Sequence, residues 1–101
     1  MNTTELTQKL LEVLANGDCI TTETDEHGFE LVTDEPVNGE VRISWVANVS
    51  GPKGIVGKVL TALAHHYTLR LTAMGEQQAE YYETIGFVRA GRDMVLAKSS
   101  E

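Results

Sequence analysis

The segment VSGPKGIVGKVLTAL, residues 49–63, sets glycines at positions 51, 54 and 57 directly before an apolar helical pattern. The residues before it predict a buried strand whose apolar face carries Val41, Ile43, Trp45 and Ala47. The first turn of a helix exposes unpaired N–H groups and a positive dipole end, and glycine lets other groups approach the backbone. A strand, a glycine loop and a helix in this order can hold a phosphate group, or can form a tight turn that binds no ligand.

Two nucleotide-binding or RNA-binding motifs with related loops do not match this segment. A Walker-type phosphate loop needs four residues between Gly and Gly-Lys, and a Ser or Thr after the lysine. Here five residues separate Gly51 from Gly57, and Val59 follows Lys58. A KH loop joins two helices on a basic surface, whereas a strand precedes this loop and the chain is acidic. Both motifs are therefore excluded.

The N-terminal half of the chain predicts a helix followed by an antiparallel meander. Apolar residues at helical spacing predict a first helix that the sequence NGD at 16–18 ends. Turn signals at DEHG, residues 25–28, and at Asn38-Gly39 divide residues 19–49 into three strands. The third strand is expected to be the most buried of the three.

The C-terminal half predicts alternating helices and strands. After a helix over about 55–66 come a strand at 68–73, a helix that Gly86 ends, and a bent strand or hairpin broken at Ala90-Gly91. The long crossover predicts that the strand at 68–73 lies parallel to the strand before the glycine loop. We therefore expect an α+β fold of the order αβββαβαβ, with a mixed sheet and flanking helices, in a single domain over residues 1–101.

The length and composition of the chain narrow the possible classes of protein. A chain of 101 residues with 42% hydrophobic content is too short for two cores. No apolar run reaches the roughly 18 residues of a membrane span, and the N-terminus lacks the pattern of a secretory signal. We expect a cytoplasmic protein without a membrane partner. The single cysteine, Cys19, excludes an internal disulfide and is expected to be a buried thiol.

The formal charge of −7 is unevenly distributed. Residues 1–40 carry ten acids and one base, Lys9, for a charge of −9, and residues 41–101 carry seven bases and five acids, for +2. An acidic chain disfavours nonspecific nucleic-acid binding, which needs clustered Lys and Arg. The second half can host an anionic ligand while the first half faces a cationic one, or the acids simply keep the surface solvated.

The segments WVANVSGPKGIVGKVL and LRLTAMGEQQAEYYETIGFVRAGRDMVL together resemble the GNAT family, the Gcn5-related N-acetyltransferases. That family has a central strand, a glycine loop that opens a helix, another strand, and a helix that ends in Tyr-x-x-x-Gly-Phe. Here the sequence YYETIGF matches this pattern, since Tyr82 lies four residues before Gly86 and Phe87 follows that glycine. The resemblance covers residues 41–98 and implies a GNAT-like acyltransferase fold.

The resemblance implies a site for acetyl-CoA between two diverging parallel strands, and an amine as the acceptor. The pantetheine is expected along the central strand and the diphosphate at the glycine loop. The implied cofactor-binding residues are Val46, Ala47, Asn48, Gly51, Pro52, Lys53, Gly54, Ile55, Val56, Gly57 and Lys58. The resemblance also implies that Tyr82 is the general acid that protonates the departing thiolate and that Glu40 is the general base. The acceptor is expected to be a small molecule or a protein lysine.

Three positions depart from the family pattern. Gly51 stands where Arg or Gln is usual, and Gly75 where an Asn usually contacts the cofactor. Val56 replaces a second small loop residue, and its branched side chain is expected to crowd the phosphates. These departures keep open the alternative of a non-catalytic GNAT-like protein, such as a small acidic inhibitor that binds a basic partner surface.

Other residues with functional side chains receive structural interpretations. Trp45 and Tyr81 are expected in the core. His65 and His66 are expected to complement the dipole at the end of the second helix. No spacing of His, Cys and carboxylates indicates a metal site.

Overall fold

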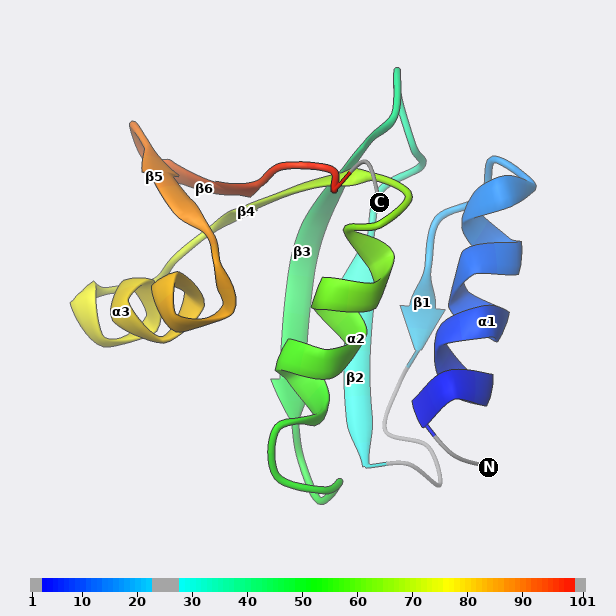
Figure 1. Ribbon diagram of the computed structural model, residues 1–101, viewed down its shortest axis with the longest axis horizontal. Helices are drawn as coiled ribbons and strands as arrows, with labels where there is room; N and C mark the ends of the chain where they lie inside the picture. Colours follow the sequence, from blue (N-terminus) through cyan, green and yellow to red (C-terminus); the bar gives the residue numbers. More distant parts are fainter. Residues whose placement is uncertain (1–2, 23–27, 100–101) are drawn as a thin grey trace.

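The computed structural model of the protein describes residues 3–22 and 28–99. Within them lie three helices and a six-stranded sheet (Figure 1). The elements are α1 (Thr3–Ala15), β1 (Thr21–Thr22), β2 (Phe29–Thr33), β3 (Glu40–Asn48), α2 (Ile55–Leu63), β4 (Thr68–Thr72), α3 (Glu76–Ile85), β5 (Val88–Ala90) and β6 (Asp93–Leu96). The predicted α+β class is confirmed. None of the helices in these segments combines the length and the hydropathy that a bilayer span requires.

The sheet is mixed and has the strand order β1-β2-β3-β4-β6-β5. Strands β1, β2 and β3 form the predicted antiparallel meander. Asn38 and Gly39, with φ of 52° and 78°, make the two-residue turn before β3, in which Val37 and Glu40 exchange two backbone hydrogen bonds of 2.9 Å. Most of the other turn signal, DEHG, lies outside the described residues. Strand β4 runs parallel to β3, as predicted.

The end of the chain differs from the predicted order by one strand. Residues 88–96 form the hairpin, β5 and β6, which was one of the two predicted possibilities and adds a strand to the predicted order. Gly91, with φ of 67°, lies in the turn between the paired residues Ala90 and Asp93. Strand β6 then inserts between β4 and β5 and runs antiparallel to both. The observed order is therefore αβββαβαββ.

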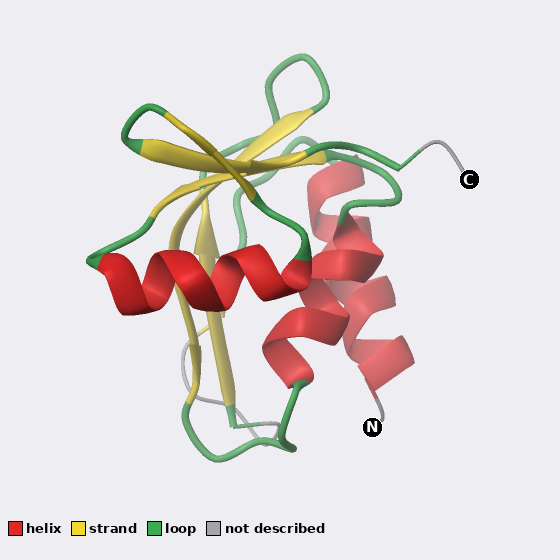
Figure 2. Cartoon of the chain, turned by 60° about the vertical axis from the view of Figure 1, so that its left-hand side comes forward, coloured by secondary structure: helices red, strands yellow, loops and turns green. Residues whose placement is uncertain are grey.

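One hydrophobic cluster joins the helices to the sheet. Figure 2 shows α1 and α2 side by side, with α3 placed across the strands near the hairpin. The predicted apolar stripe of α2 is buried and consists of Ile55, Val56, Val59, Leu60 and Leu63. From α3 only Ala79 and Tyr82 are buried, three positions apart on one face of the helix. Cys19 is exposed and not buried as expected, because Ile20 takes the core position beside it.

A β-bulge in β3 changes which side chains face the core. Val32 lies opposite Trp45 and Thr33 opposite Ile43, so Ser44 is an extra residue on β3. Because successive strand residues point to opposite faces, one extra residue reverses the alternation beyond it. Ile43 is buried, whereas Trp45 is 53% exposed. The prediction that Trp45 lies in the core is therefore wrong.

Candidate functional site: a cleft between two diverging strands

Strands β3 and β4 pair over only three positions, Glu40 with Thr68, Val41 with Leu69, and Arg42 with Arg70. Beyond them β3 continues along β2, and β4 continues along β6. The bulge at Ser44 lies just past the last of these pairs, and bulges bend a strand and increase its twist. The two parallel strands therefore separate directly after Arg42.

The separation contains a pocket of about 190 Å³. Its lining residues come from both strands and from α3 and the loop before it: Ile43, Ser44, Trp45, Val46, Ala47, Leu71, Thr72, Met74, Gln78 and Tyr82. No described strand pairs with residues 43–48 of β3 on the side of β4. This edge can therefore offer backbone donors and acceptors to an extended ligand. Of the residues predicted to contact the pantetheine, Val46 and Ala47 line the pocket.

Tyr82 brings a phenol to this pocket from α3. Its side chain is only 8% exposed and packs edge to face against Tyr81 and Phe87, with ring centroids 5.4 and 5.6 Å away. Burial, and secondly the nearby Tyr81, raise the pKa of Tyr82 above its usual value of 10.0. The hydroxyl is therefore protonated at neutral pH, as a proton donor must be. Tyr81, which was expected in the core, is 45% exposed instead, because the buried face of α3 carries Tyr82.

The side chain of Asn48 holds the glycine loop in its conformation, a role that was not predicted. The Asn48 side chain accepts a hydrogen bond from the Gly51 N–H at 2.8 Å and donates one to the Pro52 carbonyl at 3.2 Å. Asn48 was predicted to contact the cofactor, but it is not among the residues that line the cleft. An Asx-type turn signal, Asn three residues before Gly, is the sequence feature that could have identified this role.

The Gly28 carbonyl, directly before β2, holds the start of the loop. It accepts hydrogen bonds from the amides of Val49, Ser50 and Gly51, at 2.8, 3.0 and 3.2 Å. The Gly51 amide is thus used twice within the protein. The prediction that it binds a phosphate is therefore not supported by its geometry.

The start of α2 does present free donors. Gly54 has a left-handed φ of 86°, and the Ile55 N–H is bonded to the Pro52 carbonyl. Among residues 3–22 and 28–99, the amides of Gly54, Val56 and Gly57 have no hydrogen-bond acceptor. The Val56 side chain is buried in the core, so the prediction that it crowds the phosphates is wrong. Ile55 is buried too, so these two residues can contact a ligand only through their backbone.

A larger groove of about 570 Å³ begins at these amides and runs between α2 and the end of α3. It is lined by Gly54, Gly57, Lys58, Thr61, Ala62, His65, Thr84 and Ile85. Lys58 therefore lies where its charge can reach an anion at the helix start. Lys53 is exposed on the loop and does not line this groove.

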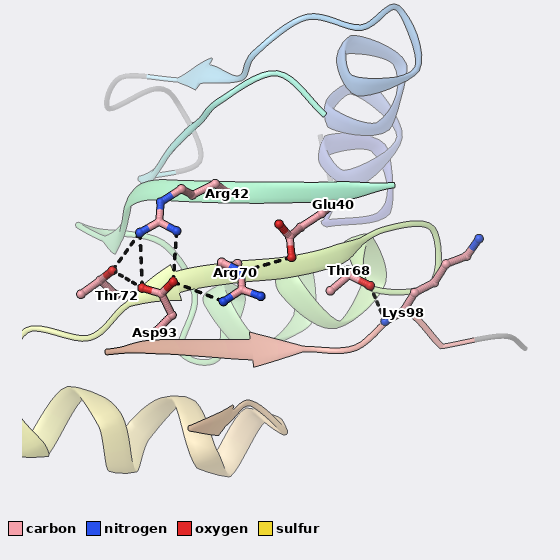
Figure 3. Close-up of polar contacts among 7 residues, drawn as sticks. All are labelled: Glu40, Arg42, Thr68, Arg70, Thr72, Asp93 and Lys98. Atoms are coloured by element: carbon pink, nitrogen blue, oxygen red, sulfur yellow. Dashed lines mark hydrogen bonds and ion pairs between the residues drawn. The ribbon is translucent and has the colours of Figure 1, made fainter. Parts of the chain in front are cut away.

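The predicted general base, Glu40, does not line the cleft that Tyr82 lines. Glu40 lies where β3 and β4 are still paired, and its carboxylate is 3.1 Å from the Arg70 Nε (Figure 3). This bond and a second one to Asp93 raise the pKa of Arg70. Glu40 is not among the residues that line the cleft, so the structure does not bring the two predicted catalytic residues together.

Asp93 is the other carboxylate of this cluster, which lies on the sheet surface that faces away from α2 (Figure 3). It contacts Arg42 at 3.2 Å, accepts a hydrogen bond from Thr72 at 2.7 Å, and contacts Arg70 at 3.3 Å. Arg42, then Thr72, then Arg70 lower the pKa of Asp93 to about 2. Such a carboxylate is a poor proton acceptor at neutral pH. The polar side chains that do line the cleft are Ser44, Thr72, Gln78 and Tyr82.

Within the described residues, no group of three or more His, Cys, Asp or Glu side chains is arranged to hold a metal ion.

Comparisons with known proteins bear on the fold alone. No family model matches the sequence, and no curated protein matches it either. A solved structure described as the crystal structure of anti-CRISPR protein AcrVA5 is similar, with a TM-score of 0.53 and 18% sequence identity over 72% of this chain and 94% of that chain. At this identity the similarity indicates a shared fold.

Proposed function

We propose that this protein is a small GNAT-type N-acyltransferase that moves an acetyl group from acetyl-CoA to an amine. The observation that carries the proposal is the separation of two parallel strands beside the buried hydroxyl-bearing side chain of Tyr82. A helix start with free amides opens a groove next to it. An extended thioester with a diphosphate has matching groups at both places.

The residues present fit such a ligand. The unpaired edge of β3 at Val46 and Ala47 can pair with amide groups, and the amides of Gly54 and Gly57 can hold a diphosphate. Lys58 adds a positive charge at the groove. When bound, acetyl-CoA supplies an acyl group activated as a thioester.

Tyr82 then has a defined role in the transfer. The acceptor nitrogen, as an uncharged amine, forms a bond to the carbonyl carbon, the carbon–sulfur bond breaks, and the Tyr82 hydroxyl donates its proton to the departing sulfur. The new amide nitrogen loses one proton to solvent, and the Tyr82 oxygen takes one back from solvent. Neither Glu40 nor Asp93 accepts the proton of the amine, since neither lines the cleft and the lowered pKa of Asp93, about 2, makes it a weak base. The amine therefore loses its proton to solvent at the open mouth, and turnover rises with pH until the free amine predominates.

Calorimetry and thermal unfolding with acetyl-CoA and CoA test the proposal. Both ligands are expected to bind and to raise the unfolding temperature, because a ligand that binds only the folded state stabilises it. Lys58→Ala is expected to weaken binding by up to about fivefold, the size of an exposed charge pair. Lys9→Ala is the matched control, because Lys9 is an exposed lysine on α1. Absence of heat and of thermal stabilisation at millimolar ligand would contradict the proposal.

A second candidate is a non-catalytic protein that binds a basic partner surface. The first forty residues favour it, since Glu12, Asp18, Asp34 and Glu35 are all exposed there. The similar structure is that of an anti-CRISPR protein, and a protein partner for this chain is compatible with that likeness. Such a complex is expected to dissociate steeply as salt is raised. Binding of acetyl-CoA together with acetyl transfer separates the first candidate from this one.

A further inference from the structure

Trp45 occupies an unusual place at the mouth of the cleft. It is the only tryptophan of the chain, and its side chain is 53% exposed although it lies in the middle of a strand. The bulge at Ser44 turns it away from the core, and it lines the same pocket as Tyr82. An aromatic surface of this size is therefore available to whatever enters the cleft from the outer face of the sheet.

A carboxylate holds the indole in place. The Trp45 Nε1–H donates a hydrogen bond to the Glu30 Oε1 at 3.1 Å. Glu30 lies on β2, opposite Ala47 of β3, so its contact with Trp45 crosses diagonally between two neighbouring strands. The site thus combines an oriented aromatic ring with a negative charge, the two features that attract a cationic nitrogen.

The charged side chains of β3 on this face are paired with each other's neighbours in the sheet. Arg42 is the nearest cationic residue along β3 on the same face, and its guanidinium is paired with Asp93 at 3.2 Å. Glu40, the acid next along the strand on that face, is paired with Arg70.

We propose that Trp45 and Glu30 form a cation subsite for the acceptor, and that the acceptor carries a second, charged nitrogen beside the amine that is acetylated. The reacting nitrogen must be uncharged to attack the thioester, whereas Trp45 and Glu30 favour a charged one. One nitrogen cannot satisfy both conditions at the same time. Trp45 and Glu30 are therefore specificity-determining residues, and diamines are better acceptors than monoamines of the same chain length. This inference rests on the proposed transfer reaction.

Tryptophan fluorescence tests the subsite without the reaction, since Trp45 is the only tryptophan. Diaminobutane is titrated in the absence of CoA, with butanol as the uncharged control. A saturable change in emission is expected with the diamine alone. Glu30→Gln retains an oxygen acceptor for the indole but removes the charge, and is expected to weaken the titration by about fivefold. Glu35→Gln removes an exposed acid that does not contact Trp45 and is expected to change nothing.

Acetylation kinetics complete the test. The KM of diaminobutane is expected to be about fivefold below that of butylamine, and Glu30→Gln is expected to abolish that difference. A peptide with adjacent Lys and Arg, compared with the free diamine, shows whether the two nitrogens belong to a small molecule or to a peptide; preference for either over butylamine supports the inference.

Two further outcomes separate this inference from the proposed function. Equal titrations for the wild type and Glu30→Gln, with normal acetyl transfer, would overturn the cation subsite alone. A charge-dependent titration without any acetyl transfer would refute the transferase and the acceptor role, and would leave a cation-binding site at Trp45.

Discussion

The two halves of β3 belong to one strand, but only the first half has a neighbouring strand on the side of β4. Residues 40–42 pair with β4, and on the outer face Glu40 and Arg42 join Arg70 and Asp93 in a closed network of ion pairs. Residues 43–48 have no partner on that side in the described structure, and they expose Trp45. The first half is satisfied within the chain, whereas the second half leaves backbone and aromatic surface accessible.

A single extra residue accounts for much of this difference. Ser44 bends the strand where pairing with β4 ends, and it reverses the alternation so that Trp45 leaves the core. A continuous strand paired along its whole length would have no cleft. The lesson is that a local irregularity can produce both a site and the side chain that faces it.

The largest difference is expected between substitutions at Ile43 and Trp45, the residues on either side of the bulge at Ser44. Ile43→Ala is expected to destabilise the protein by about 3 kcal/mol, because Ile43 is a buried core residue. Trp45→Ala is expected to cost about 1 kcal/mol or less, since it removes an exposed cross-strand contact. Urea unfolding measures both. Similar losses for the two variants would mean that Trp45 is packed in the core and that the bulge is absent.

Tyr82→Phe tests whether the cleft beside the open half of β3 is the site of the proposed acetyl transfer. Turnover is expected to fall by about 100-fold while the affinity for CoA stays unchanged, since only the donated proton is lost. In the wild type, Tyr82 is expected to limit turnover only above pH 10.0, because its pKa is raised above that value. Steady-state kinetics across pH, with Tyr81→Phe as the exposed control, check both points. Unchanged turnover in Tyr82→Phe would remove this hydroxyl from the mechanism.

Gly28→Ala tests how the open half is anchored on the side of β2. Gly28 has a φ of 66°, and an added Cβ would lie 2.5 Å from the Gly51 nitrogen. We expect a loss of about 2 kcal/mol, from the left-handed backbone and the displaced loop. Gly57→Ala is the control, because its Cβ would meet Ile85 at an ordinary 3.7 Å. In the helix that change is expected to stabilise by about 0.5 kcal/mol. A Gly28→Ala variant as stable as the wild type would contradict the close packing at the loop.

Asp93→Asn tests the paired half and is expected to have the smallest effect, because water screens the ion pairs at this surface. The folded pKa of about 2 lies below the ordinary 3.8, so the ionised carboxylate stabilises the folded state above the ordinary value. That contribution is lost as the pH falls through about 2. Unfolding midpoints of the wild type and the variant should therefore differ at neutral pH and converge in acid. A constant difference at every pH would contradict this role of Asp93.

Most of the architecture could be predicted because it depends on repeating patterns. The apolar stripe of α2, the Asn38-Gly39 turn and the end of α3 at Gly86 all follow from local spacing and backbone preference. The final hairpin was only one of two predicted possibilities, because a glycine in a short strand marks either a bend or a turn.

The candidate site could be predicted in outline only. Tyr82 and the start of α2 were identified by the family resemblance, and both lie at a pocket or a groove. Glu40 does not line the cleft, and the sequence could not indicate this because it depends on where two strands stop pairing. The side-chain role of Asn48 and the contact of Trp45 with Glu30 depend on loop closure and on strand register.

The positions of the helices and strands and the apolar faces of the helices follow from the amino-acid sequence, because these properties depend on neighbours a few residues away. The tertiary structure alone decided the face on which Trp45 lies. Residues 45–47 are all apolar, so alternation cannot say where a bulge reverses it. The parting of β3 and β4 was likewise decided in three dimensions, because strand pairing is a contact between segments about 28 residues apart, from Glu40 to Thr68.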